Sequence, residues 1–156
     1  MAKRQPLKTG SRGFTLVELL AVLAILALLL GLVSPRLYTG LERERFRASV
    51  RSFAAALRLA RSAAVTDRQP TRVMVDLERG RWWLEGSRRG GSWPPGTRVS
   101  QATLVWPDTG RRLGYMVFYP DGSSTGGQLL LVDRQGRTCA VTVDIVTSRV
   151  EIEAGG

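Results

Sequence analysis

The sequence predicts an α+β protein in which one long N-terminal helix packs on antiparallel β-sheet, with two sheets expected. Two observations on the 156 residues carry this prediction. Up to residue 69 the apolar residues form first an unbroken run and then a stripe at helical spacing. From residue 71 onward they alternate with polar residues, and no strand-helix-strand order follows that would indicate parallel pairing.

The first part of the predicted helix is the apolar run of residues 14–34. As a helix, such a run spans roughly 30 Å, which is the thickness of the hydrocarbon core of a bilayer. Residues 1–13 before it carry four cations and no acid, as is typical of the cytoplasmic flank of a membrane segment. The run contains one charge, Glu18, and a carboxylate deep in hydrocarbon costs roughly 2.5–3.5 kcal/mol on insertion scales. Glu18 therefore needs a partner.

Two simpler explanations of this segment fit less well. A cleaved secretory signal has an apolar core of about 7–15 residues and then a small-x-small site, but this run is longer and lacks such a site. An unprocessed membrane anchor leaves Glu18 unexplained. Pro35 has no N–H for the carbonyl of Gly31, so we expect a bend where the helix leaves the bilayer, either as a simple exit or as a mechanical hinge.

The second part of the predicted helix is amphipathic and covers residues 35–69. Its apolar positions are separated by four, three, four, three and four residues, which places them on one face. These positions are Phe46, Val50, Phe53, Leu57, Ala60 and Ala64. The arginines on the other faces are either solvated or available to neighbouring subunits. The helix is expected to end within Thr66-Asp67-Arg68-Gln69-Pro70.

Alternating apolar and polar residues predict strands throughout the globular part, residues 70–156. The expected strands are 71–77, 81–85, 97–106, 113–119, 128–133, 138–145 and 149–153. Residues 86–96 are rich in Gly, Ser and Pro and are expected to form a loop. Cys139 shares a strand face with Val141, Val143 and Ile145, so we expect a small buried thiol.

The composition limits the chemistry that the chain can perform. There is no histidine and only one cysteine, which excludes histidine general bases, Cys/His metal sites and an intrachain disulfide. No constellation of acid, base and nucleophile is visible, so we expect no enzyme, no cofactor and no metal site. The net charge of +10 points to an anionic partner, although every cation after residue 13 is arginine, which can also reflect genome composition.

The octet GFTLVELL, residues 13–20, resembles the processing site of type IV pilins and type II secretion pseudopilins. The family pattern of Gly, Phe, Thr, Leu, an apolar residue, Glu and Leu is matched position by position. The resemblance implies that a membrane-embedded aspartyl prepilin peptidase cuts after Gly13 and removes residues 1–13 as a leader peptide. It also implies N-methylation of the new terminus, Phe14, and retention of residues 14–34 as a transmembrane and assembly helix.

Such processing would explain Glu18. Cleavage leaves a cationic amine on Phe14 at the edge of a low-dielectric region, where a charge pair is far less costly than a lone charge. Glu18 of one subunit can pair with the Phe14 amine of its neighbour and so set the register of the two subunits during assembly. It can also pair within its own chain, and the two arrangements can follow one another as the subunit leaves the membrane.

The loop 119–127, preceded by Phe118 and followed by the apolar run 128–132, resembles the C-terminal signature of the H-type minor pseudopilins, the GspH/FimT family. This resemblance implies a pilin-like fold. It implies a minor pseudopilin of a type II secretion system, which joins the periplasmic pseudopilus near its tip, and this pseudopilus drives protein export across the outer membrane. The implied partners are prepilin peptidase, other major and minor pseudopilins and the inner membrane.

The loop itself allows two kinds of role. The Asp and Ser oxygens of residues 120–127 could ligate calcium, and its successive amides could cradle a phosphate. The loop has only one carboxylate, Asp121, and no helix begins after it. A turn between two strands is therefore favoured.

The alternative function is a minor type IV pilin that binds DNA for uptake in natural transformation. The arginine content favours it, because phosphate contacts dominate DNA affinity. The competence members carry a Gly-Arg-x-Arg motif near the C-terminus, but the matching stretch Ser148-Arg149-Val150-Glu151 lacks the glycine and the second arginine. Nucleic-acid binding is therefore not expected. The leader predicts a single-pass inner-membrane protein with its N-terminus in the cytoplasm and residues 35–156 in the periplasm.

Overall fold

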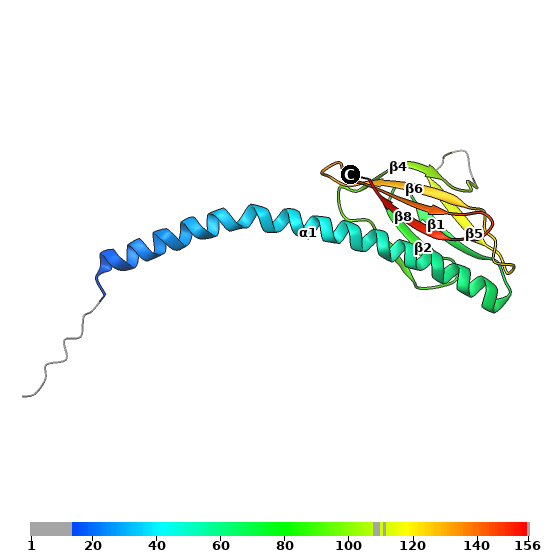
Figure 1. The fold of residues 1–156 in the computed structure, drawn as a ribbon, viewed down its shortest axis with the longest axis horizontal. Helices are drawn as coiled ribbons and strands as arrows, with labels where there is room; N and C mark the ends of the chain where they lie inside the picture. Colours follow the sequence, from blue (N-terminus) through cyan, green and yellow to red (C-terminus); the bar gives the residue numbers. More distant parts are fainter. Residues whose placement is uncertain (1–13, 108–109, 111, 156) are drawn as a thin grey trace, which may run out of the picture. The chain divides into compact units, whose positions relative to one another are not determined.

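The computed structural model describes residues 14–155 apart from 108, 109 and 111, without the side chains of residues 30–39. The chain divides into two compact units, Met1–Leu41 and Glu42–Gly156, which we call unit 1 and unit 2. The single helix α1, Leu16–Asp67, contributes residues to both units (Figure 1). Each unit is described by itself.

Unit 1 contains the N-terminal part of α1. Its described side chains, from Phe14 to Leu29 and at Gly40 and Leu41, are all exposed. Within the described residues, no helix is both long enough and apolar enough to cross a membrane. The transmembrane segment expected at residues 14–34 includes five residues whose side chains lie outside the description, so that assignment stays a prediction.

Unit 2 begins with the amphipathic part of α1. All six apolar stripe residues expected to face a core are buried, from Phe46 at 4% exposure to Ala64 at 0%. The helix ends at Asp67, and the next residue, Arg68, has a positive φ of 52°, the left-handed conformation that commonly terminates helices. The apolar stripe therefore faces the core, and the helix ends within the stretch expected for its end.

The first sheet contains the strands that immediately follow the helix. Its strands are β1 (Thr71–Asp76), β2 (Arg81–Leu84), β3 (Gly90–Ser92) and β5 (Leu113–Phe118). They pair in the order β3-β2-β1-β5, and each pairing is antiparallel.

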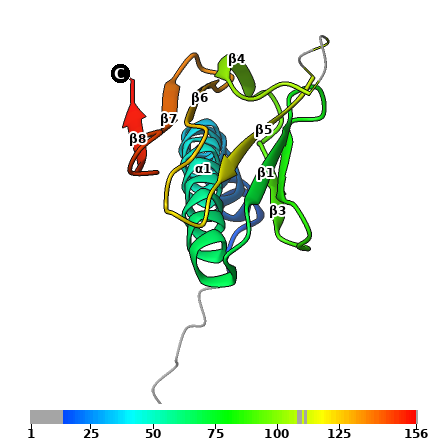
Figure 2. The same ribbon diagram turned by 90° about the vertical axis from the view of Figure 1, so that its right-hand side faces the viewer.

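The second sheet contains most of the C-terminal half of the chain. Its strands are β4 (Arg98–Thr103), β6 (Gly127–Val132), β7 (Thr138–Val143) and β8 (Val150–Ala154). Their order is β4-β6-β7-β8, again with antiparallel pairs only. The expected fold of a helix on two antiparallel sheets is therefore confirmed. Figure 2 shows the part of α1 that lies in unit 2 in end view, with β7 and β8 to one side and β1 and β3 to the other.

One hydrophobic core joins the helix to both sheets. Phe53 lies at its centre and contacts two tryptophans, with ring centroids 5.6 Å from Trp82 and 5.2 Å from Trp93. Every buried residue of this core lies between Phe46 and Val150, inside unit 2. Because unit 2 encloses a complete core, we expect it to fold without unit 1.

Two expectations about the β-region are corrected. Residues 86–96 are not only loop, since they contain β3 and place Trp93 in the core at 7% exposure. The glycines suggested a loop, but here they allow the backbone of β3 to lie close against the Trp82 side chain. A Cβ at Gly91 would lie only 2.7 Å from Trp82 Cζ2. Ile145 is 62% exposed and lies beyond the end of β7, so it does not share the buried face of Cys139.

Candidate functional site

The N-terminal motif forms the entrance to α1. Thr15 is the last residue before the helix, and its Oγ1 accepts a hydrogen bond of 3.2 Å from the backbone N–H of Glu18. The carbonyl of Thr15 accepts a bond of 3.1 Å from the N–H of Leu19. Phe14 lies just outside the helix and is 78% exposed. The residue that is expected to become the new terminus and the carboxylate expected to pair with it are therefore one helical turn apart, and both are accessible.

Thr15 and Glu18 have the spacing of a helix capping box, Thr-x-x-Glu. Sequence analysis missed this role, although the spacing was visible in the motif. The threonine satisfies one of the amide donors that the first helical turn leaves unpaired. The acid in the first turn also interacts favourably with the positive end of the helix dipole. Glu18 thus has a local role in starting the helix besides any role between subunits.

The remaining predicted N-terminal positions are not tested by this geometry. Gly13, on the amino side of the expected cleavage, lies outside the described residues. The backbone at Gly31 and Pro35 is helical, but their side-chain surroundings also lie outside the description. Cleavage after Gly13, methylation of Phe14 and a bend at Gly31 and Pro35 remain predictions.

The loop 119–127 is held by its own hydrogen bonds. Asp121 Oδ1 accepts bonds from the N–H and the hydroxyl of Ser123, at 2.9 and 2.6 Å. These bonds lower the pKa of the Asp121 carboxyl below its ordinary value. Gly122, with φ of 85°, completes a turn in which its N–H donates to the carbonyl of Tyr119. The carboxylate is used inside the turn, as expected for a connection between strands.

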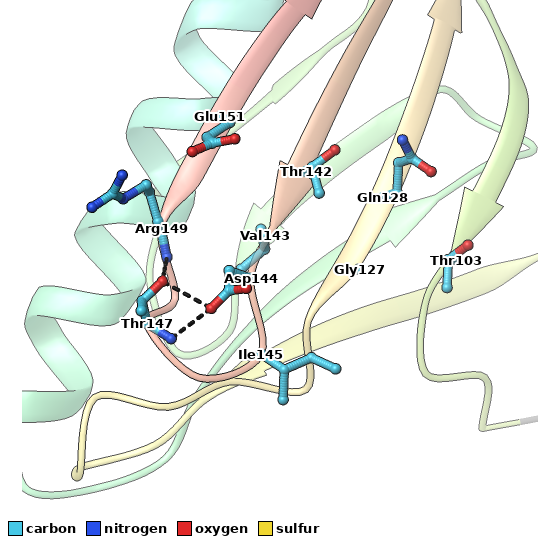
Figure 3. Close-up of a pocket in the computed structure, with 10 residues that line it drawn as sticks. All are labelled: Thr103, Gly127, Gln128, Thr142, Val143, Asp144, Ile145, Thr147, Arg149 and Glu151. Atoms are coloured by element: carbon cyan, nitrogen blue, oxygen red, sulfur yellow. Dashed lines mark hydrogen bonds between the residues drawn. The ribbon is translucent and has the colours of Figure 1, made fainter.

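A shallow hollow of about 690 Å³ lies at one end of the second sheet, and both polar and apolar groups line it (Figure 3). Thr103, Gln128, Thr142 and Glu151 form a row there, one residue from each strand, as the pairing register requires. Asp144 caps the turn that follows β7. Such a surface can form hydrogen bonds to a partner.

Asp144 is also committed to its own turn. Its Oδ1 accepts bonds from Val146 N–H, Thr147 N–H and the Thr147 hydroxyl at 3.0, 2.7 and 2.8 Å. The bonds from Thr147, and then that from Val146, lower the pKa of Asp144. Within the described part of the chain, no three residues among His, Cys, Asp and Glu lie together as a metal site would need.

Cys139 is a core residue, as expected. Its side chain is 7% exposed and packs in the apolar cluster under β7. Burial raises the pKa of its thiol, and the positive charge of Arg47 only partly opposes this effect. A thiol in this state is a poor nucleophile.

A helix that begins with this motif and then packs on two antiparallel sheets defines a pilin-like protein. The fold is similar to that of the minor pseudopilin EpsH from the Type 2 Secretion System of Vibrio cholerae, with a TM-score of 0.56 and 16% identity over 72% of this chain and 98% of that chain. It is also similar to the type IV minor pilin FimU of Pseudomonas aeruginosa PAO1, with a TM-score of 0.53 and 16% identity over 73% and 95%.

Sequence comparisons resolve the class further. Residues 8–34 match the model of the prokaryotic N-terminal methylation motif, and residues 49–148 match that of the type II transport protein GspH. The chain is 31% identical over 126 residues to the type II secretion system protein H of Xanthomonas campestris pv. campestris, covering 81% of this chain and 74% of that protein. The chain belongs to the type II transport protein GspH family.

Proposed function

We propose that this chain assembles into the periplasmic pseudopilus near its tip and takes part in protein export across the outer membrane. Its family identifies it as a minor pseudopilin of type II secretion. The observation that carries the proposal is the combination of two matches on one chain: the N-terminal motif at residues 8–34 and the GspH domain at residues 49–148. The N-terminal motif supplies a segment for assembly, and the GspH domain is of the type found in type II secretion.

The N-terminal motif supports a specific processing step. Prepilin peptidase cleaves between Gly13 and Phe14, and the new amine of Phe14 is then methylated. Gly13 suits such a site because a residue without a side chain can enter a narrow protease cleft in extended form. The exposure of Phe14, outside the first helical turn, leaves its backbone accessible.

The membrane topology follows from the leader. Its four cations hold the N-terminus in the cytoplasm, residues 14–34 cross the inner membrane, and the globular domain lies in the periplasm. Arginine and lysine near a membrane segment set its orientation in this sense.

Assembly uses the charge pair between Phe14 and Glu18. The carboxylate of one subunit binds the terminal amine of the next, because each charge would otherwise lie unpaired near hydrocarbon. The capping bond from Glu18 N–H to Thr15 supports this role, because it stabilises the backbone of the first turn, which carries Glu18.

The test compares Glu18→Ala with Glu44→Ala in the full chain. Glu44 is a matched control because its carboxylate is exposed on the same helix, 62% accessible, and forms ion pairs with Arg47 and Arg51. We expect Glu18→Ala to reduce cross-linking to the other pseudopilins about tenfold, equivalent to about 1.4 kcal/mol, while membrane insertion is unchanged. Normal incorporation of Glu18→Ala would sink the pairing mechanism.

The family match does not favour the DNA-uptake alternative. A titration of residues 37–156 with duplex DNA at two salt concentrations checks this directly. No binding at low salt, together with co-purification of other pseudopilins, agrees with secretion. Micromolar, steeply salt-dependent binding without such partners would contradict it.

A further inference from the structure

A small basic hollow lies at the end of unit 2 where the chain enters it. It measures about 280 Å³. Its lining residues are Arg43, Phe46, Arg47, Arg137, Thr138, Cys139, Ala154 and Gly155. We call it the arginine hollow, because three guanidinium groups line it and none of its lining residues is acidic.

One of these cations is fixed in place. Asp133, only 7% exposed, accepts a hydrogen bond of 2.6 Å from Arg137 Nε and also contacts its Nη2. Its other oxygen accepts the N–H of Gln135 and the N–H of Arg137 itself. Because Arg137 is already oriented before any ligand arrives, little conformational entropy is lost when an anion binds to it.

The charges of the other two cations, Arg43 and Arg47, are less fully neutralised by acids. Arg47 approaches Glu44 only at 4.0 Å, and both side chains are largely exposed. Among the described residues, Arg43 has no carboxylate within the 4.0 Å of an ion pair. Thr138 adds a hydroxyl to the lining, while Phe46 and Ala154 add apolar surface. The hollow thus offers cations and a hydroxyl beside an apolar wall.

A neighbouring hollow shows the contrast. It shares Phe46 and Arg137 and adds Arg45 and Arg134, but two acids, Glu42 and Asp133, also line it. Its cations are therefore partly neutralised by their own neighbours. The arginine hollow is the stronger anion site of the two.

We propose that the arginine hollow binds the phosphate of an anionic phospholipid headgroup in the membrane that the chain's own N-terminal segment enters. The proposal rests on the proposed function only in placing residues 14–34 in that membrane. The apolar wall suits the glycerol and first methylenes of a lipid, which a free phosphate lacks.

The chain itself links the arginine hollow to the proposed membrane segment, which favours lipid headgroups as the anions that the hollow meets. Arg43 is nine residues beyond Ser34, the end of the proposed membrane segment. Nine residues rise about 14 Å as a helix and reach at most about 32 Å when extended, however the two units are placed. A tethered site at this distance meets the headgroups at high effective concentration. Binding there would hold unit 2 at the membrane until the subunit leaves for the filament.

The test uses residues 37–156, which contain all of unit 2 and its core. Binding to vesicles of phosphatidylglycerol and phosphatidylcholine is measured by co-sedimentation, with phosphatidylcholine vesicles alone as reference. The variant is Arg43→Gln with Arg47→Gln. The matched control is Arg88→Gln with Arg89→Gln, which removes the same charge from two exposed residues between β2 and β3.

We expect the hollow variant to bind anionic vesicles about thirtyfold more weakly, from about 1 kcal/mol for each basic residue at a charged membrane surface. The control pair should lose less than about threefold. Equal losses in the hollow and control pairs, or no binding at low salt, would overturn the proposal. Complete displacement by tens of millimolar inorganic phosphate would assign the site to free phosphate instead.

The same proteins are titrated with duplex DNA. Loss of DNA binding in the hollow variant, with vesicle binding unchanged, would make the occupant a nucleic acid and overturn the lipid assignment. Cross-linking of the full chain to other pseudopilins is measured in parallel. If that assembly is normal while vesicle binding is absent, only the lipid site falls and the proposed function stands.

Discussion

The hairpin between β6 and β7 depends on one buried carboxylate, and Asp133→Asn tests how much. Asp133 Oδ1 accepts the N–H of Gln135 at 2.9 Å and that of Arg137 at 3.0 Å. Oδ2 accepts the Nε of Arg137 at 2.6 Å. Asparagine keeps one carbonyl oxygen for the two amides, but it replaces the second oxygen by an NH₂ group that faces the guanidinium.

The expected loss in stability follows from these contacts. Hydrogen bonds to charged groups contribute about 1.5–3 kcal/mol each. Because Arg137 is 29% exposed, solvent screens part of this, and we expect the free energy of unfolding to fall by about 2 kcal/mol. For a domain of this size, each kcal/mol shifts Tm by roughly 4 °C, so the variant should melt about 8 °C lower at pH 7.

The pH dependence provides a second, independent measurement. Burial by itself raises the pKa of Asp133, but the hydrogen bonds and charge of Arg137, together with the N–H of Gln135, outweigh burial and lower the pKa below its ordinary value. A carboxyl with a lowered folded-state pKa stabilises the fold above its unfolded value, near 3.9, and loses that effect as pH falls through the folded value. The difference in Tm between wild type and variant should therefore be constant above about pH 5 and shrink below about pH 4.

The assay is thermal unfolding of residues 37–156, followed by circular dichroism from pH 2.5 to 7. Asp121→Asn is the matched control, since Asp121 also has a lowered pKa from bonds within its turn but is fully exposed. We expect little change in that variant. A Tm for Asp133→Asn within about 2 °C of wild type at pH 7, or a difference at pH 2.5 as large as that at pH 7, would refute the reasoning.

Three further predictions follow from the core, the leader and the thiol. Phe53→Ala should lower the free energy of unfolding in urea by about 4 kcal/mol, because it opens a cavity beside two tryptophans. Val65→Ala on the same helix, 47% exposed, should change it by less than about 1 kcal/mol, and equal effects would contradict the assigned core. Gly13→Val should leave the precursor uncleaved on immunoblots of membranes, and normal maturation would rule out this cleavage site. Cys139 should react with a thiol reagent at least about 100-fold more slowly in the native protein than in denaturant, since its thiol is buried and its pKa is raised. Rapid native labelling would show that β7 opens.

Local patterns were sufficient to predict most elements of the fold. The stripe from Phe46 to Ala64 can bury one face only as a helix, and the alternation around Val73 and Val141 can do so only as strands. The prediction failed where one residue type has two structural uses. Glycine at positions 90 and 91 indicated a loop, but it permits β3 to cross Trp82, and this crossing brings Trp93 into the core.

For the candidate sites, too, local sequence patterns were sufficient for some features and not for others. The residues expected to be cleaved and paired, Gly13, Phe14 and Glu18, lie within six positions of one another, so the motif alone was enough to predict these roles. The capping bond from Glu18 to Thr15 was equally local and could have been found from the Thr-x-x-Glu spacing. The exposed Ile145 was misplaced because alternation does not show where a strand ends and its turn begins.

The amino-acid sequence was sufficient to predict the helix and every described strand except β3, and it contains the N-terminal motif, because each depends on residues within a few positions of one another. The order of strands in the two sheets, the place of Trp93 and the arginine hollow could be read only from the folded chain. The hollow brings Arg43 and Arg47 on the helix together with Arg137 on a hairpin, which lies 94 and 90 residues further along the chain. No local pattern encodes that proximity, because it follows from how the helix packs against the second sheet.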